Sequence, residues 1–236
     1  MSSRLTREAP LLDFGPAVKT AGFLVRDHEL VLSELSDLQV SGAPVRAVNK
    51  RRAEFLAGRW AAQQALAALG VAATPERNED GSPRWPAHVA GSITHGAERA
   101  LCAVALARDV RSLGIDAERL MDARASEELR ARICSDAERQ AMTSGLAVPE
   151  HHAVTLAFSA KESLYKCLYP FVGHFMDFHA ARVLSITGEL HDARGRGELV
   201  LELALDWSAE FQAGRTLTAR WALEANRVET AVLLPA

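Results

Sequence analysis

Glu162 and Lys166 lie in the segment F-S-A-K-E-S-L-Y-K, which spans residues 158–166. Residues four apart on a helix share one face, so this carboxylate and this ammonium would point into the same space. Such a pair could accept a proton and neutralise a phosphate. It could also be a surface ion pair, with Ser159 and Glu162 forming a capping box. Apolar residues on both sides of Ser159 favour one continuous helix, in which a cap is unexpected: Val154, Ala157, Phe158, Leu164, Tyr165 and Leu168.

Two further carboxylates lie in the segment S-L-G-I-D-A-E at residues 112–118. If this segment is a strand, alternate side chains point to opposite faces. Gly114, Asp116 and Glu118 then share one face, and Leu113, Ile115 and Ala117 share the other. The alternative is that the two carboxylates belong to a solvated strand end.

Three carboxylates that a fold brings together repel one another unless a cation lies between them. Oxygen ligands select a hard ion such as Mg²⁺, which commonly binds phosphate oxygens as well. If Asp116, Glu118 and Glu162 meet in the fold, they would therefore suit magnesium and a phosphate-containing substrate.

A basic helix is predicted at residues 46–69, where apolar residues recur at helical spacing and Gly70 follows as a stop signal. Arg51 and Arg59 lie on roughly the same side, about 12 Å apart along the axis, and could bracket a polyphosphate. A solvated basic face is the alternative. Gly58 weakens the helix by about 1 kcal/mol, which would make sense if something must approach the backbone there.

A short segment between Gly91 and Gly96 contains Ser92, Thr94 and His95. Hydroxyls and an imidazole beside glycines could receive a phosphate or a purine base. A single histidine is more often structural than a ligand, so this segment is a candidate only together with other residues.

The length of 236 residues allows one large domain or two lobes of about 100 to 120 residues. Hydrophobic residues make up 48% of the chain and charged residues 24%, and no apolar run approaches a membrane span. The N-terminus lacks the apolar core of a secretory signal, so we expect a soluble, cytoplasmic protein. The net charge of −3 gives no general attraction to nucleic acid. Three cysteines are expected to be reduced and mostly buried: Cys102, Cys134 and Cys167.

The second half is predicted to contain a strand, helices and then an antiparallel meander, and Ser135 and Glu138 fit only the capping box of a short helix. The meander strands are expected at residues 181–187, 198–205, 216–223 and 228–234. In the first half, residues 21–25 could form a strand and an apolar run covers residues 101–107. Long helices beside strands in both halves permit two similar α+β lobes.

Large apolar residues gather just after residue 166, around Gly173. They are too many for a solvated loop, so they form either a docking surface for a partner or part of a core. The residues are Phe171, Phe175, Met176 and Phe178.

These motifs resemble those of the 4′-phosphopantetheinyl transferases of the Sfp and enterobactin synthetase component D type, which serve siderophore, polyketide and nonribosomal peptide synthetases. The match lies in G-S-I-T-H at 91–95, G-I-D-A-E at 114–118 and the segment at 158–166. Weaker similarity covers residues 50–59, 81–86 and 175–178, so the resemblance spans roughly residues 46–183.

The resemblance implies an α+β fold of two pseudo-symmetric lobes, each an antiparallel sheet packed on a long helix, with the active site between them. We place the lobes at residues 1–110 and 111–236. The resemblance also implies that Mg²⁺, for which Mn²⁺ could substitute, binds Asp116, Glu118 and Glu162. Glu162, Lys166 and Asp116 would be catalytic, with Glu162 as the base. The co-substrate coenzyme A would be held by Arg51, Arg59, Arg84, Ser92, Thr94, His95, Asp116, Lys161 and Lys166.

One departure from the family concerns Asp80, because relatives often have a basic residue just before the G-x-P segment. Arg84 could supply that charge. The implied reaction is attack of a carrier-protein serine on coenzyme A, with release of 3′,5′-ADP. The partners would be apo acyl, peptidyl or aryl carrier proteins, and we expect a monomer without nucleic-acid or membrane partners. The alternatives are a non-catalytic relative that binds coenzyme A or a carrier, and a Mg²⁺-dependent nucleotide pyrophosphate hydrolase.

Overall fold

The computed structural model describes residues 5–44, 46–192 and 194–236. The chain forms two compact units. The first comprises Met1–Leu113 and Leu234–Ala236, and the second comprises Gly114–Leu233. We expected the boundary after residue 110, whereas the units divide after Leu113, within a strand.

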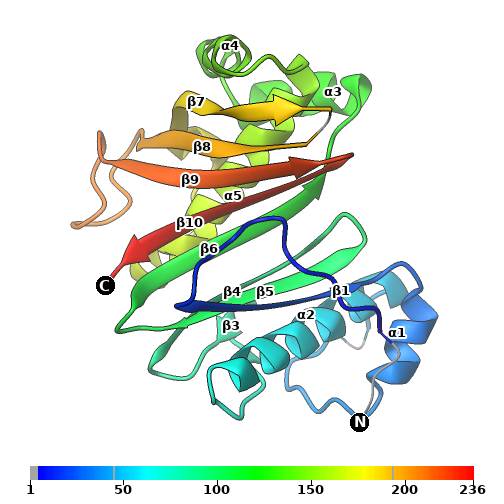
Figure 1. Cartoon of the computed structure of the whole chain (residues 1–236). Coiled ribbons are helices and arrows are strands. Elements are labelled where there is room, and N and C mark those ends of the chain that lie inside the picture. The colour runs from blue at the N-terminus through cyan, green and yellow to red at the C-terminus, as the bar shows by residue number, and fades with distance from the viewer. Residues whose placement is uncertain (1–4, 45, 193) are drawn as a thin grey trace. The chain divides into compact units, whose positions relative to one another are not determined.

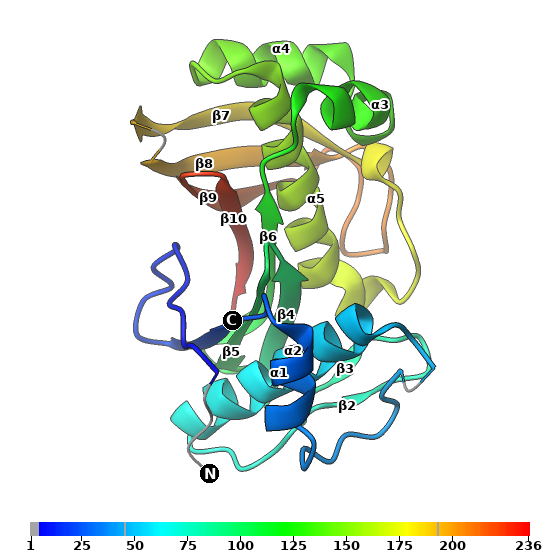
Figure 2. The same ribbon diagram turned by 90° about the vertical axis from the view of Figure 1, so that its right-hand side faces the viewer.

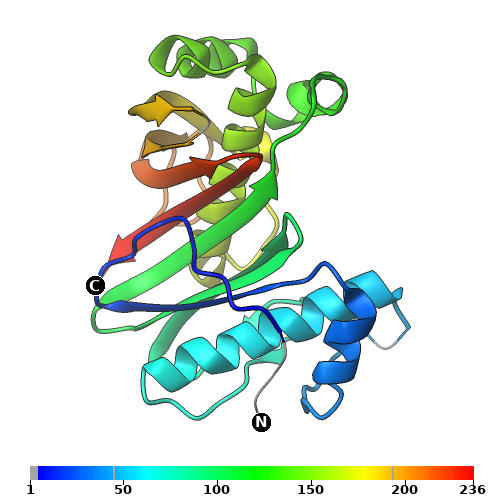
Figure 3. The same ribbon diagram turned by 45° about the vertical axis from the view of Figure 1, so that its right-hand side comes forward.

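The first unit is built on a three-stranded antiparallel sheet with the strand order β1-β5-β4. The long helix α2 (Asn49–Ala68) packs on this sheet, and the short helix α1 (His28–Glu34) packs against α2 (Figure 3). The strands of the sheet are β1 (Val18–Leu24), β4 (Val89–Gly96) and β5 (Arg99–Leu106). A small ribbon follows α2 and consists of β2 (Glu76–Arg77) and β3 (Pro83–Arg84).

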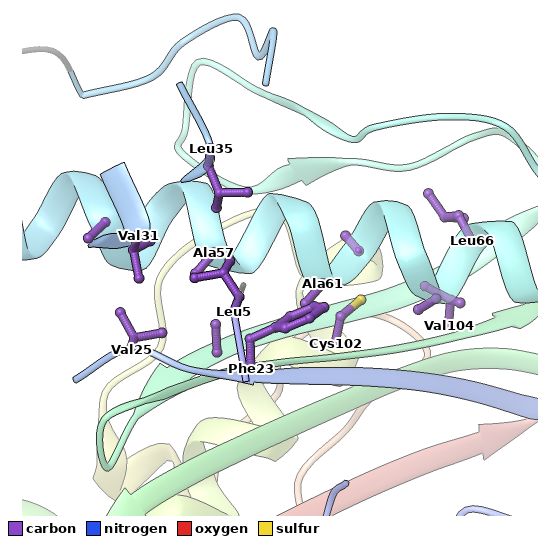
Figure 4. Packing of buried hydrophobic residues seen from close by; sticks show 14 of the residues in the cluster. Leu5, Phe23, Val25, Val31, Leu35, Ala57, Ala61, Leu66, Cys102 and Val104 are labelled. Atoms are coloured by element: carbon purple, nitrogen blue, oxygen red, sulfur yellow. The ribbon is translucent and has the colours of Figure 1, made fainter. Parts of the chain in front are cut away.

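Small residues let α2 lie close to its sheet. Buried alanines line the helix, and side chains such as Phe23, Cys102 and Val104 fill the space between it and the strands (Figure 4). A Cβ built on Gly58 would come within 2.9 Å of Ile93 Cγ2 in β4. The expectation that something approaches the backbone closely at Gly58 is therefore met, and the approaching group is the Ile93 side chain.

Helix α2 ends as the sequence predicts. Gly70 has a φ of +78°, the left-handed conformation that glycine adopts without strain. Its amide donates to the Ala67 carbonyl, and the Val71 amide donates to the Leu66 carbonyl, each at 2.9 Å. These two bonds form a Schellman motif, which satisfies carbonyls that the helix end would leave open.

The second unit is built on a five-stranded sheet with the order β6-β10-β9-β8-β7. The long helix α5 (Glu150–Val172) lies along one side of it (Figures 1 and 2). The strands are β6 (Val110–Arg119), β7 (Ala181–His191), β8 (Arg194–Leu203), β9 (Thr216–Glu224) and β10 (Arg227–Pro235). The other helices are α3 (Ala123–Ile133), α4 (Asp136–Gly145) and the single turn Phe178–Ala180.

The sequence predicted the α+β class and the packing of each antiparallel sheet on a long helix, and both are confirmed. Helix α5 runs through Ser159, so this residue is not a cap. All four C-terminal strands form, and the three cysteines are free and buried. Helices α1 and α3 were not predicted.

The hairpin of β7 and β8 is longer than the sequence predicted. Its outer part contains glycines and charged residues, so no apolar alternation indicated that it forms strands. Gly188 pairs with Gly197 across the hairpin. A Cβ on Gly188 would lie 2.6 Å from the indole of Trp221, whose Nε1 donates to the Thr187 carbonyl at 3.1 Å. The covering indole therefore stabilises strands that the residue pattern does not reveal.

No helix in the part of the chain that the structure describes is both long and apolar enough to cross a membrane.

Candidate active site

Helix α5 and strand β6 are in backbone contact at Gly114. A Cβ built there would lie 2.0 Å from the Ser163 carbonyl oxygen and 2.5 Å from the Cys167 nitrogen. Only glycine leaves room for the helix. Asp116 and Glu118 share the strand face of Gly114, so they lie on the face that α5 covers.

Asp116 and Lys166 form an ion pair between these two elements. Lys166 Nζ donates to Asp116 Oδ1 at 2.7 Å and to the Ile115 carbonyl at 3.2 Å. The Asp116 side chain is 3% exposed and that of Lys166 is 26% exposed. The structure thus joins two residues that lie 50 positions apart in the sequence.

Glu118 and Glu162 lie within electrostatic range of this pair. Burial raises the pKa of Glu118 to about 8. The charges of Asp116 and Glu162 add to this shift, and the charge of Lys166 opposes it. Burial also raises the pKa of Glu162, where Lys166 opposes the shift and Asp116 adds to it. Three carboxylates therefore share one region whose negative charge Lys166 offsets only in part.

A ready metal site is not found among the residues that the structure describes: no three His, Cys, Asp or Glu side chains are arranged to hold an ion. Asp116 is engaged by Lys166 instead. The donor chemistry still fits a hard divalent cation, because all three groups are carboxylates and their charged forms are disfavoured by burial and mutual repulsion. A cation would relieve both effects.

Lys161, a predicted coenzyme A ligand, lies in a buried ion pair, and its role as a ligand stays a prediction. Its side chain is 3% exposed, and its ammonium lies 2.6 Å from Glu138 Oε1. It also donates to the Ile133 carbonyl, at the C-terminus of α3, at 2.8 Å. A buried ammonium that is held by a carboxylate and a helix end already has its charge compensated, which argues against Lys161 as a pyrophosphate ligand.

Glu138 does more than the capping role that the sequence indicated. The capping box with Ser135 is present, as predicted. In addition, Glu138 Oε1 accepts from the Val183 amide at 2.9 Å, where β7 shifts its pairing register with β8. This carboxylate therefore joins α4, α5 and the edge strand β7. The sequence carries no signal for the contact, because its partners are distant along the chain.

Arg59 is a buried arginine in the first unit. Its side chain lies over the Phe55 ring, with Cζ 4.9 Å from the centroid, and the residue is 4% exposed. No carboxylate pairs with it among the described residues, and its Nε has no hydrogen-bond partner there. Burial lowers the pKa of Arg59 to about 10; Cys102 opposes the shift and Arg77 contributes to it. Such an uncompensated cation is suited to an anion.

The N-terminus of α2 has the opposite of the usual charge pattern. Val48 makes no side-chain cap, and the first turn contains no acidic residue. Lys50 and Arg51 lie there instead, and both are exposed. Cations are unfavourable at the positive end of a helix dipole, so this end would gain from a bound anion.

Strand β4 does not bring its three predicted residues to one face. Ile93 packs on Gly58 of α2, and His95 shares the face of Ile93 by the two-residue alternation. Ser92 and Thr94 are buried on the opposite face. Only His95 therefore points to the side that carries α2.

Arg77 lies within electrostatic range of Arg59, a relation that the sequence analysis did not predict. Arg84, the expected substitute for the missing basic residue, is exposed and forms an ion pair with Glu76 in the neighbouring strand. Arg77 instead lies near enough to Arg59 to lower its pKa, and its guanidinium would lie 3.1 Å from a Cβ at Gly81. The ribbon of β2 and β3 thus provides a second basic residue beside Arg59.

The apolar cluster around Gly173 divides into two parts. Phe171 packs on Phe211 with ring centroids 5.5 Å apart, and Phe178 packs on Phe158 at 5.2 Å. Phe175 is 74% exposed. A pocket in this region is lined by Glu162, Lys161, Tyr165, Phe175, Met176, Asp177, Phe178, Ala181 and Trp207. An exposed aromatic therefore borders a pocket that reaches a candidate catalytic carboxylate.

Two family models match the chain. The 4′-phosphopantetheinyl transferase N-terminal domain matches residues 41–105, and the 4′-phosphopantetheinyl transferase superfamily matches residues 112–223.

Similar proteins include three curated relatives. Enterobactin synthase component D of Salmonella typhimurium is 36% identical over 208 residues, which cover 88% of this chain and 80% of that protein. The 4′-phosphopantetheinyl transferase PptT of Mycobacterium tuberculosis is 36% identical over 191 residues, covering 80% and 82%. The 4′-phosphopantetheinyl transferase Svp of Streptomyces mobaraensis is 40% identical over 141 residues, covering 58% and 56%.

Proposed function

The chain belongs to the 4′-phosphopantetheinyl transferase superfamily, and we infer from this that it transfers the 4′-phosphopantetheine group of coenzyme A to a serine of an apo carrier protein. The observation that carries the inference is the family match at residues 112–223, because it contains the whole group of Asp116, Glu118, Glu162 and Lys166. The relatives named for enterobactin synthesis support a role in siderophore production.

The chemistry requires that a serine hydroxyl loses its proton while its oxygen bonds to phosphorus. The phosphorus–oxygen bond to 3′,5′-ADP breaks at the same centre. We propose Glu162 as the base, acting directly or through a water, because burial raises its pKa and makes it a better proton acceptor. Lys166 would stabilise the charge that develops on the phosphate oxygens.

We propose that Asp116, Glu118 and Glu162 hold a Mg²⁺ ion, for which Mn²⁺ could substitute. When bound, the ion would neutralise charge on the pyrophosphate of coenzyme A. Lys166 compensates the charge of Asp116, and its ammonium is the nearest cation that could also meet a phosphate of the substrate. The charge relations among the three carboxylates support this assignment.

For the nucleotide end of coenzyme A we propose Arg59, His95 and Arg51, with Arg77 in place of Arg84 as the additional basic residue. The support is the buried cation of Arg59 without a carboxylate, the basic start of α2 and the nearness of Arg77. Roles for Ser92 and Thr94 stay predictions, as do a site between two lobes, the monomeric state and the cytoplasmic location.

Arg59→Ala is expected to weaken the binding of coenzyme A more than the binding of 3′-dephospho-coenzyme A. A charge-assisted hydrogen bond is worth about 1.5 to 3 kcal/mol, or roughly ten- to a hundredfold in affinity. Calorimetric titration of both ligands measures the difference. Arg52→Ala is the matched control, because Arg52 lies on the same helix and contacts the Asn49 side chain. Equal losses for the two ligands would exclude contact of Arg59 with the 3′-phosphate.

Phe175→Ala is expected to raise the KM for the carrier protein about tenfold and to leave the KM for coenzyme A and the Tm nearly unchanged. Phe175 is mostly exposed, so its ring is available to a partner and adds little to the fold. Steady-state kinetics with each substrate varied in turn checks this. The control is Phe171→Ala, which should instead lower the Tm because its ring packs on Phe211. A change in the coenzyme A constant alone would show that the pocket holds coenzyme A rather than the carrier.

The proposed function is tested by incubating the protein with coenzyme A, Mg²⁺ and several apo carrier proteins. A carrier mass increased by one phosphopantetheine group would demonstrate transfer. Binding of coenzyme A without any change in carrier mass would indicate a non-catalytic relative. Release of 3′,5′-ADP in the absence of a carrier would indicate a pyrophosphate hydrolase.

A further inference from the structure

Three buried hydroxyls join helix α5 to strand β10. Ser159 Oγ lies 2.9 Å and Ser163 Oγ lies 2.7 Å from Thr230 Oγ1. Ser163 Oγ also donates to the Thr230 carbonyl at 3.0 Å. All three residues have no exposed surface. One arrangement of protons satisfies every hydroxyl: Ser159 donates to Thr230, Thr230 donates to Ser163, and Ser163 donates to the carbonyl.

Hydroxyl groups are not needed to fill this buried space. Its neighbours on α5 are apolar and fully buried, including Ala160, Leu164 and Leu168. Apolar side chains of similar shape could replace hydroxyls here at little cost to stability, since the net value of such bonds is small. Apolar packing is non-directional, whereas hydrogen bonds fix distance and angle. The cluster therefore supplies direction rather than burial.

The direction matters because the same turns of α5 carry the candidate catalytic residues. Glu162 directly precedes Ser163, and Lys166 follows three residues later. At Gly114 nothing but backbone separates the helix from β6. A slip by one residue would move the helix by about 1.5 Å and rotate its side chains by about 100°. Such a slip would take Lys166 away from Asp116.

We propose that Thr230 is a positioning residue, which fixes the register of α5 on the sheet so that Glu162 and Lys166 meet Asp116 and Glu118. The proposal rests on the transferase function inferred above. Ser159 and Ser163 lie one turn apart on one face of the helix, and both hydroxyls lie within hydrogen-bond distance of the Thr230 hydroxyl. Thr230 thereby resists movement of the helix in either direction along its axis.

The test is Thr230→Val, which keeps the shape of the side chain and removes its hydroxyl. The kcat is expected to fall about 10- to 100-fold, the cost of misplacing catalytic groups by about 1 Å, with the KM for coenzyme A unchanged. Amide hydrogen exchange in residues 159–166 should become faster. Thr230→Ser restores the hydroxyl and should recover the kcat.

Thr155→Val is the matched control for loss of a buried hydroxyl on α5. Thr155 Oγ1 donates to the His151 carbonyl and accepts from the Met121 amide, so this variant should lose stability but keep its kcat. A Thr230→Val enzyme with the parental kcat would overturn the positioning role. A Thr230→Ser enzyme with a kcat as low as that of Thr230→Val would overturn it too. Equal loss of kcat in the Thr155 control would overturn it as well. A parent protein that modifies no carrier would overturn the transferase function itself, and this outcome is seen before any variant is compared.

Discussion

Asp116→Ala is expected to reduce the transfer rate by at least about 100-fold, the scale of removing one group that stabilises transition-state charge. Asp116 is a proposed Mg²⁺ ligand and the partner that holds Lys166 on the strand face. The substitution removes both functions at once. Carrier modification at several Mg²⁺ concentrations measures the loss, which should be greatest when Mg²⁺ is limiting.

The fold is expected to survive this substitution. Lys166 keeps its bond to the Ile115 carbonyl and is open to solvent on one side, so its charge is not stranded. The charge of Asp116 also raises the pKa values of Glu118 and Glu162, and its removal takes away this repulsion between carboxylates. The matched control is Asp109→Ala, because Asp109 directly precedes β6 and pairs only weakly with Arg108. Transfer near the parental rate at limiting Mg²⁺ would contradict the metal assignment.

Lys161→Met is expected to destabilise the protein by about 3 to 5 kcal/mol, because it leaves the Glu138 carboxylate buried without its cation. For a chain of this size the Tm should fall by roughly 6 to 20 °C. Lys50→Met makes the same substitution at an exposed lysine, whose ammonium lies 4.0 Å from Glu54 Oε1, and should change the Tm little. Adding Glu138→Gln to Lys161→Met should restore much of the loss, since the buried charge is then gone.

The pH dependence of this effect follows from Glu138. Burial by itself would raise its pKa, but Lys161 and the amides of Ser135 and Val183 hold the pKa below its ordinary value. Its contribution to stability is therefore present above the pKa of the unfolded chain and is lost as the pH falls through the lower folded value. The Tm difference between parent and variant should narrow over that range. A variant with the parental Tm but weaker coenzyme A binding would instead support Lys161 as a coenzyme A ligand.

Much of the molecule could be predicted from local pattern. Apolar spacing and Gly70 predicted α2, and the apolar flanks of Ser159 predicted that α5 is continuous. The alternation at residues 112–118 predicted the strand that carries Asp116 and Glu118. These features depend on neighbours within one or two turns, and such interactions are written in adjacent residues.

The outer part of the β7–β8 hairpin and the ion pair of Lys161 could not be predicted from local pattern. The glycine pair of β7 and β8 is stabilised by Trp221, which belongs to another strand. Lys161 has the residue type and the position of a phosphate ligand, yet its ammonium is taken by Glu138 from a different helix. A local pattern cannot indicate a partner that lies far along the chain.

By itself the sequence determined the family and the fold class and led to the proposed group of carboxylates, because residue types at fixed spacings suffice for these. The tertiary structure decided which charged groups are available. It paired Lys161 with Glu138, left Arg59 buried without a carboxylate and put Arg77 rather than Arg84 beside it. It also pinned α5 to β10 through Thr230. The physical reason is that charge compensation and hydrogen bonding depend on distances between elements, which only the packed chain defines.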